Sequence, residues 1–480
     1  MSHGQTIAKN AAWLMAATAG QKAIAFLAFY VIARLSGPEV TGKYFFAVAV
    51  TSVFVVITDL GLTPVVIREM AADENRGRVL LGRALRAKAL LIPCAVIVSL
   101  AYAWLSHVSH ELLSAIVIAC GVMSADALSL VWYGAIRGRR QLRFEAIGMF
   151  TGQMLTATLG IGSTFFLRGN VQALVVALLI GSLWNVGWSL RQAQRLGLSP
   201  LADDPSHAWW PLMRAAMPFA LAGIFVKVYS YVDTLLLKHF HSAVEIGHYA
   251  VAYKITYAFQ FLPLTFVAAL YPGMSSAHAA DDREGLRTVF AGALRLMMLV
   301  SVPIAAGLSA LSPWLPRLYG RAYAGSIAPL TVLAWVLIPI FLDFPVGSLL
   351  NATHRAAKKT TAMGAAMVVN IVMNVLLVPA FGPLGAAWSG LISFTLLCVI
   401  GFWFTRRDFL SLPWLASLLL RGALAASLIW MFTRFAMAHL SAWFVFPLTG
   451  IVMVVIVFGM RLLLLDDLRL IRSWLKPDRV

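Results

Sequence analysis

Long apolar runs separated by short polar links occupy almost the whole chain. The runs have the length of helices and do not alternate between apolar and polar positions with the period of two that marks a half-buried strand. Because a helix needs about 20 apolar residues to cross a bilayer, the sequence predicts an all-α fold of about 14 transmembrane helices. They are expected at residues 10–34, 44–67, 86–106, 112–135, 145–167, 171–190, 212–237, 246–271, 290–313, 326–352, 360–378, 383–404, 413–433 and 442–464.

The composition and the placement of charge favour a membrane protein. Hydrophobic residues make up 60% of the 480 residues and charged residues only 12%, about half the charged fraction of a soluble domain. The net charge of +18 would suggest a nucleic-acid partner in a soluble protein, but most lysines and arginines lie in the links. With a cytoplasmic N-terminus, the basic links fall on the cytoplasmic side, including the cluster from Arg68 to Lys88 and "RGRRQLR" at 137–143. Both termini are then cytoplasmic, and no nucleic-acid partner is expected.

Two halves of the chain resemble each other. An ungapped offset of 205 residues aligns Lys22 with Lys227, Gly42 with Gly247 and Tyr44 with Tyr249, and a later match aligns Asp126 with Asp343. A repeat of six helices inserts both copies with the same orientation. The predicted organisation is an N-terminal lobe at 1–195, a cytoplasmic linker at 196–211, a C-terminal lobe at 212–405, and a segment at 406–480 with two further helices and a basic cytoplasmic tail.

A few charged residues lie inside the predicted helices. A charge at the bilayer centre costs roughly 2.5–3.5 kcal/mol on insertion scales, so such residues usually face a cavity, a partner or a substrate. Lys22 and Lys227 lie near the middles of the first helices of the two lobes. Because transporters built from such repeats bind substrate at the repeat interface, the two lysines are predicted to face each other across a central cavity.

Several stretches of the sequence resemble a known family. They are "SGPEVTGKYFFAVAV", "DLGLTPVVIREMA", "GHYAVAYKITYAFQFLPLTFVAALYPGMSS" and "NIVMNVLLVPAFGPLGAAWSG". Together they resemble the polysaccharide transporter branch, with its Wzx-type flippases, of the multidrug/oligosaccharidyl-lipid/polysaccharide exporter superfamily. The resemblance implies two six-helix lobes around a central cavity and alternating access in a bacterial inner membrane. It also implies an undecaprenyl-pyrophosphate-linked oligosaccharide as cargo, with cation coupling and a polysaccharide polymerase as a further partner.

The embedded bases then become candidates for substrate binding. The ammonium groups of Lys22 and Lys227 would hold the pyrophosphate as point charges; the alternative is an ion pair with Asp233 or Asp59. Tyr231 shares the face of Lys227 at i+4 and could stack on sugar rings. Lys254 is either a second cavity cation or a side chain that extends toward the interface.

Four embedded acids are candidates for ion coupling: Asp126, Asp343, Asp59 and Asp233. A carboxylate of this kind would bind a proton or a sodium ion as the lobes move. The alternative for each is an interhelical contact that satisfies its charge.

Other functions remain open within the same fold. The chain could flip a peptidoglycan lipid precursor or export amphipathic drug cations, although a site for cations should be acidic. A membrane glycan polymerase or ligase is the alternative from another class, but the predicted outer loops are short and no HExxH motif occurs. The three cysteines all lie in apolar runs, so neither disulfides nor a metal site are expected. We therefore expect a transporter without enzymatic activity and without a cofactor.

Overall fold

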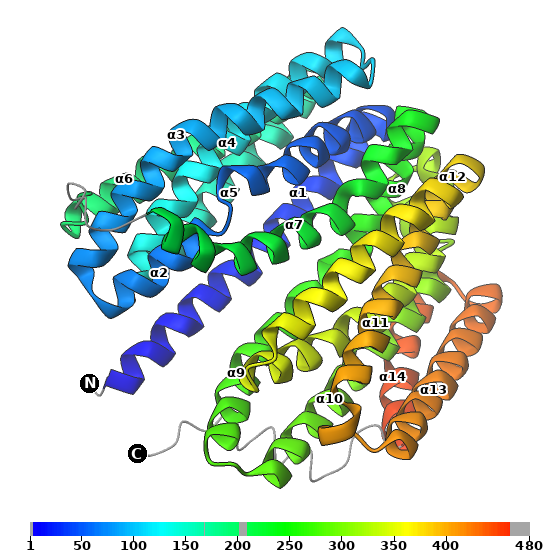
Figure 1. The fold of residues 1–480 in the computed structure, drawn as a ribbon. Coiled ribbons are helices and arrows are strands. Elements are labelled where there is room, and N and C mark those ends of the chain that lie inside the picture. Colours follow the sequence, from blue (N-terminus) through cyan, green and yellow to red (C-terminus); the bar gives the residue numbers. More distant parts are fainter. Residues whose placement is uncertain (1–2, 168, 201–208, 461–480) are drawn as a thin grey trace. The chain divides into compact units, whose positions relative to one another are not determined.

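The computed structural model describes residues 3–167, 169–200 and 209–460, and in these ranges the chain is helical without strands (Figure 1). The predicted all-α fold is therefore confirmed. The basic tail at 461–480 and most of the predicted linker, at 201–208, lie outside the described residues. The chain divides into two compact units, Met1–Ala250 and Val251–Val480.

The first unit contains seven complete helices and the first part of an eighth, together with one short 3-10 helix. They are α1 (His3–Phe54), η1 (Val55–Thr58), α2 (Leu62–Ala72), α3 (Glu74–Leu105), α4 (His110–Gly138), α5 (Leu142–Phe166), α6 (Val171–Arg195), α7 (Trp209–Phe240) and α8 (Ala243–Tyr257). The sequence-based division assigned residues 212–405 to one lobe. Here α7 belongs to the first unit, because it packs on α1, α2 and η1.

The second unit contains the end of α8 and the rest of the described chain. Its elements are η2 (Ala258–Gln260), α9 (Phe261–Ala279), α10 (Arg283–Leu311), η3 (Leu315–Tyr319), η4 (Arg321–Ser326), α11 (Ile327–Ala352), α12 (Ala356–Phe409), α13 (Leu412–His439) and α14 (Ala442–Gly459). Within the described ranges of the whole chain, nine helical spans are long and apolar enough to cross a membrane. The protein is a multi-pass membrane protein.

Two pairs of predicted helices are joined where a glycine precedes a proline. At Gly37 the backbone has φ 79° and ψ 173° inside α1, and at Gly382 it has φ 54° and ψ −131° inside α12. Glycine tolerates these positive φ values, and the following proline cannot donate the helical hydrogen bond. The chain therefore kinks at a single residue, and helical geometry continues on both sides of it.

Two other predicted helices are interrupted instead. The helix predicted at 44–67 ends in η1 and restarts as α2 after Gly61, which has φ 76°. The helix predicted at 246–271 passes through η2 before α9 begins. Such breaks leave little mark on the apolar periodicity, because η1 and η2 are only four and three residues long.

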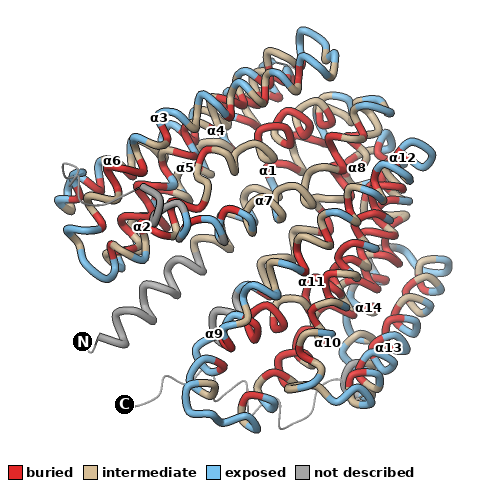
Figure 2. The backbone as a smooth tube through the Cα atoms, viewed as in Figure 1, coloured by how far each residue is buried: buried red, intermediate tan, exposed pale blue. Residues whose placement is uncertain are grey.

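Buried residues lie on the inner faces of the helices in each unit, and exposed residues follow their outer faces (Figure 2). In the first unit, Leu81, Val131 and Ile136 belong to a core cluster shared by α2, α3, α4, α6 and α7. The outer faces carry large apolar side chains, such as Leu90 on α3 and Phe435 on α13. This outward apolar surface is what a lipid environment requires.

Candidate functional site

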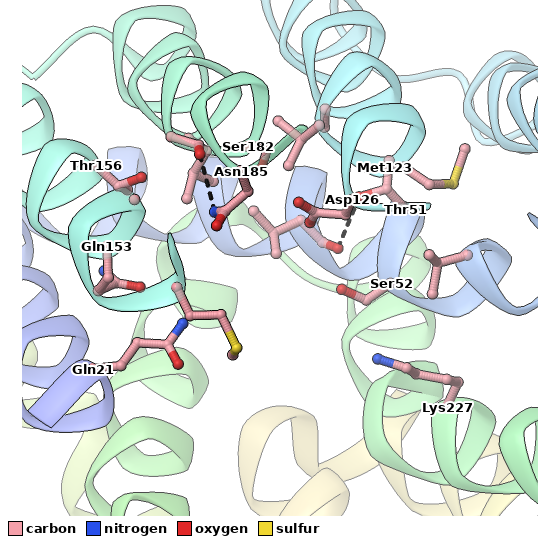
Figure 3. A pocket seen from close by; sticks show the side chains of 18 residues that line it. Gln21, Thr51, Ser52, Met123, Asp126, Gln153, Thr156, Ser182, Asn185 and Lys227 are labelled. Carbon is pink, nitrogen blue, oxygen red and sulfur yellow. Dashed lines mark hydrogen bonds between the residues drawn. The ribbon is translucent and has the colours of Figure 1, made fainter. Parts of the chain in front are cut away.

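A hollow of about 300 Å³ lies inside the first unit. Its walls come from α1, η1, α4, α5, α6 and α7, and Figure 3 shows the side chains that line it. Within the described lining, Lys227 and Asp126 are the charged residues, and most of the others are amides, hydroxyls and methionines. A concave site with convergent polar groups is a candidate binding site, because such groups fix the orientation of a ligand.

Lys227 comes from the middle of α7 and lines the hollow. It lies close enough to Lys22 and to Asp126 for their charges to act on it, with Lys22 repelling it and Asp126 attracting it. Lys22 is exposed and follows Gln21, a lining residue on α1. Among the residues described, neither lysine is in an ion pair. The structure therefore places Lys227 in the lining of the hollow and Lys22 close enough for its charge to act on Lys227, while Lys22 itself is not a lining residue.

Asp126 lies on α4, at the middle of a membrane-spanning helix, yet its side chain is exposed. The exposure arises because the carboxylate faces the hollow (Figure 3). Ser182 of α6 is its side-chain hydrogen-bond partner. The carboxylate is thus held in place and remains accessible to a small ion.

Tyr231 lies one turn after Lys227 on α7, as the helical spacing predicts. The Lys227 ammonium is 5.8 Å from the centre of the Tyr231 ring, a distance typical of a cation–π contact. The Tyr231 hydroxyl forms a hydrogen bond with Ser52, which lines the hollow. Tyr231 therefore contacts two lining residues, Lys227 and Ser52, but does not itself line the hollow.

Asp59 lies outside the lining of the hollow. Its charge is neutralised by Lys88, which the sequence places in a cluster of basic links. The Lys88 ammonium is 2.7 Å from Oδ1 of Asp59 and 3.1 Å from the Thr58 carbonyl oxygen. Asp59 also accepts two hydrogen bonds from Thr63 in the first turn of α2, one of 3.2 Å from the backbone N–H and another from the hydroxyl. Lys88 is fully buried inside α3 and therefore does not lie in a link between helices.

The Lys88–Asp59 pair yields a stability prediction. Lys88→Ala should lower the free energy of unfolding by about 2 kcal/mol. Removal of one partner of a fully buried pair costs about 3–5 kcal/mol, and here Asp59 is 16% exposed. A matched replacement of exposed Lys358 should have no comparable effect. Thermal unfolding of the two purified variants measures the difference, and equal stabilities would contradict a structural role for the pair.

Asp233 is buried at the interface of α7 and α8 and has neutral partners. It accepts a hydrogen bond from the Tyr249 hydroxyl and others from the Thr234 backbone (2.6 Å) and hydroxyl (3.2 Å). It does not pair with Lys227. The described contacts therefore contain no ion pair between Lys227 and Asp233.

The remaining two candidates lie in the second unit. Asp343 of α11 is bound by the ammonium of Lys359 on α12. Lys254 lies in the last turn of α8 and is half-buried. Neither residue lines the hollow of the first unit. The repeat-related acids thus differ, because Asp126 faces a hollow while Asp343 is held by a lysine.

The sequence reasoning missed the uncharged half of the site. Gln21 of α1 and the α5 residues Gln153 and Thr156 line the hollow, and their side chains lie on the opposite side from Lys227 in Figure 3. A single amide in an apolar helix carries no spacing motif and costs less to bury than a charge, so no sequence signal selects these residues.

Comparisons with known proteins agree with the fold. The chain matches the family described as "Polysaccharide biosynthesis protein" over residues 7–278 and the family "MatE" over residues 218–376. It is 21% identical over 384 residues to the probable low-salt glycan biosynthesis flippase Agl15 of Haloferax volcanii, with 78% of each chain covered. It is 27% identical over 274 residues to the probable flippase AglR of the same organism, where the match spans 55% of each chain.

Solved structures share the fold at low identity. A lipid II flippase MurJ in an inward closed conformation superposes with a TM-score of 0.75 at 14% identity, covering 96% of this chain and 99% of that one. An inward-facing multidrug resistance MATE transporter of the MOP superfamily superposes with a TM-score of 0.69 at 15% identity, covering 80% and 94%. At such identities the likeness concerns the fold and leaves the cargo open.

Proposed function

The chain belongs to the polysaccharide biosynthesis protein family, and from this premise we propose that it is a flippase for lipid-linked oligosaccharides. The cargo is an oligosaccharide repeat unit joined through pyrophosphate to undecaprenol, the substrate class that the sequence resemblance implies. The protein moves this cargo across the inner membrane of a bacterium by alternating access, with both termini in the cytoplasm, and delivers it to a polysaccharide polymerase.

One observation carries the proposal: Lys227 lines the hollow, Lys22 is close enough for its charge to act on Lys227, and neither ammonium has an ion-pair partner in the described chain. Like charges held close together in a membrane interior are unfavourable until an anion lies near both. A pyrophosphate carries several negative charges and suits such a pair. A site for drug cations would need the opposite sign of charge.

The purified full chain in liposomes tests the proposal. Undecaprenyl pyrophosphate carrying a short oligosaccharide should move between the leaflets in protein-containing vesicles and not in empty ones, as a lectin or glycosidase that reaches only the outer leaflet would report. Transport of an amphipathic drug cation with no movement of the lipid-linked glycan would refute the proposal in favour of a drug exporter. Conversion of the glycan to longer chains would point to an enzyme.

Among the four embedded acids, Asp126 is the best candidate for cation coupling. Its exposed carboxylate attracts Lys227 and faces the same hollow. A proton or sodium ion at Asp126 would release Lys227 from this attraction and reduce the repulsion of an anionic head group. Cation binding and pyrophosphate binding then strengthen each other, as thermodynamic linkage requires. Asp59, Asp343 and Asp233 have protein partners already, so we propose structural roles for them.

This role for Asp126 makes a second prediction. Asp126→Asn should remove the stimulation of flipping by an imposed proton or sodium gradient, about tenfold if the coupling is of the usual size. Flipping without a gradient should persist, because the neutral amide no longer holds Lys227. Asp126→Glu should restore the gradient dependence in part. An unchanged response of Asp126→Asn to both gradients would exclude Asp126 as the coupling site.

A further inference from the structure

Three polar side chains at one end of the hollow have hydrogen-bonding groups that the protein does not use. We propose that Gln21, Gln153 and Thr156 form a subsite for a neutral sugar ring, the one joined directly to the pyrophosphate. This inference rests on the proposed flippase function and adds a specificity site to it. It concerns the end of the hollow that lies away from Lys227 (Figure 3).

The other polar side chains of the lining already have partners. Asn185 accepts a hydrogen bond of 2.9 Å from the Tyr133 hydroxyl and donates one of 3.1 Å to the Gly181 carbonyl oxygen. Thr51 donates to Val48 at 3.1 Å. These groups hold the helices together and would lose a bond if they turned to a ligand.

Gln21, Gln153 and Thr156 differ in this respect, since none of them has a hydrogen-bond partner among the residues that the structure describes. All three are only partly buried, so the free groups are open to the hollow. Each amide offers two donors and a carbonyl acceptor, and the threonine hydroxyl offers both functions. These three side chains therefore suit the hydroxyl groups of a sugar ring, which also both donate and accept hydrogen bonds.

The charge distribution selects a neutral sugar. In the described lining, the charged side chains are Lys227 and Asp126, and neither lies beside the two glutamines in Figure 3. A carboxylated sugar at the amide end would find no cation among the described lining residues beside it. The methionines Met123 and Met149 also line the hollow, and they offer apolar, adaptable contacts to the C–H faces of a ring.

The size of the hollow and the connectivity of the cargo agree with this arrangement. A volume of about 300 Å³ lies at the lower end of the range of about 300–1,000 Å³ for small-molecule sites. A whole oligosaccharide would not fit, but a sugar next to the pyrophosphate would. Because that sugar is bonded to the pyrophosphate held near Lys227, it is the part of the oligosaccharide that can reach the opposite end of the same hollow.

Binding to the purified full chain tests the subsite. The probes are undecaprenyl pyrophosphate without a sugar, the same lipid with one glucose or one N-acetylglucosamine, and the same lipid with one glucuronic acid. The natural protein should bind at least one neutral glycolipid about tenfold more tightly than the bare lipid, as expected for a few net hydrogen bonds. The glucuronic acid lipid should show no such gain.

The variants Gln21→Met plus Gln153→Met, and separately Thr156→Val, should remove the gain from the sugar and leave the affinity for the bare lipid unchanged. Gln194→Met is the matched control, because Gln194 is an exposed amide near the end of α6 and does not line the hollow. Thermal unfolding verifies that each variant is folded.

The outcomes separate the two proposals. If the natural protein binds bare and glycosylated lipids equally, or if both subsite variants keep the full gain, the sugar subsite is refuted while the pyrophosphate site stands. If the gain occurs only with glucuronic acid, a neutral-sugar site is likewise refuted. If no pyrophosphate lipid binds at all, the proposed function itself fails, and the subsite fails with it.

Discussion

Simultaneous replacement of Lys22 and Lys227 by alanine is expected to abolish flipping of lipid-linked oligosaccharide while the protein remains folded and inserted. Each charge-assisted contact to a phosphate is worth about 1.5–3 kcal/mol, so each lysine should change affinity by about 10- to 100-fold. The two ammonium groups lie within electrostatic reach of each other, so both can act on one pyrophosphate. The double variant should therefore lose the head-group site completely.

Two controls make the lysine prediction specific. Lys238→Ala removes a lysine from the last turn of α7, outside the lining of the hollow, and should leave flipping unchanged. Lys22→Arg with Lys227→Arg keeps both charges and should retain measurable transport. Full transport by the double alanine variant at normal protein levels, measured in vesicles, would mean that the head group binds elsewhere.

The sequence was sufficient for the helices because lipid exposure demands apolar residues on every turn, and this demand is visible along a single chain. The turns within α1 and α12 were not predicted, since the chain was expected to leave the helix between two spans. Instead, the backbone changes direction at a single glycine, Gly37 in α1 and Gly382 in α12, and stays helical on both sides. A glycine–proline pair between two apolar runs is the signal that could have been used.

The candidate site was predicted only in part. Lys22 and Lys227 could be selected because an unexplained charge in an apolar helix is conspicuous. The lysine that pairs with Asp59 could not be selected, since Lys88 lies 29 residues away on α3 and its burial depends on tertiary packing. The amides of Gln21 and Gln153 were missed for a different reason: their role depends on which face of each helix borders the hollow.

The internal repeat has a physical counterpart in the contact between α1 and α8. Gly42 packs against the backbone of Ala243 and Gly247, and Gly247 packs against the backbone of Pro38. Gly42 and Gly247 are related by the offset of 205 residues, and so are Pro38 and Ala243. Each segment thus presents the same two positions to the other, as at an axis of two-fold symmetry. Alignment of the glycines alone could not show that they touch.

Gly42→Ala and Gly247→Ala are each expected to destabilise the fold by about 3 kcal/mol, the upper end for overpacking, and the double variant should fail to accumulate as folded protein. A Cβ atom at Gly42 would overlap the carbonyl oxygen of Ala243, and one at Gly247 would overlap that of Pro38. Backbone atoms cannot move aside as a flexible side chain can, so α1 and α8 would have to separate.

Gly162→Ala in α5 is the matched control, because no atom lies within 4 Å of the added Cβ. Alanine is favoured over glycine in a helix by about 1 kcal/mol, so this variant should be as stable as the natural protein or slightly more so. Thermal unfolding of the purified variants gives the comparison. If Gly42→Ala gained stability as Gly162→Ala does, the close crossing of α1 and α8 could not exist, and the symmetric contact between the repeats would be wrong.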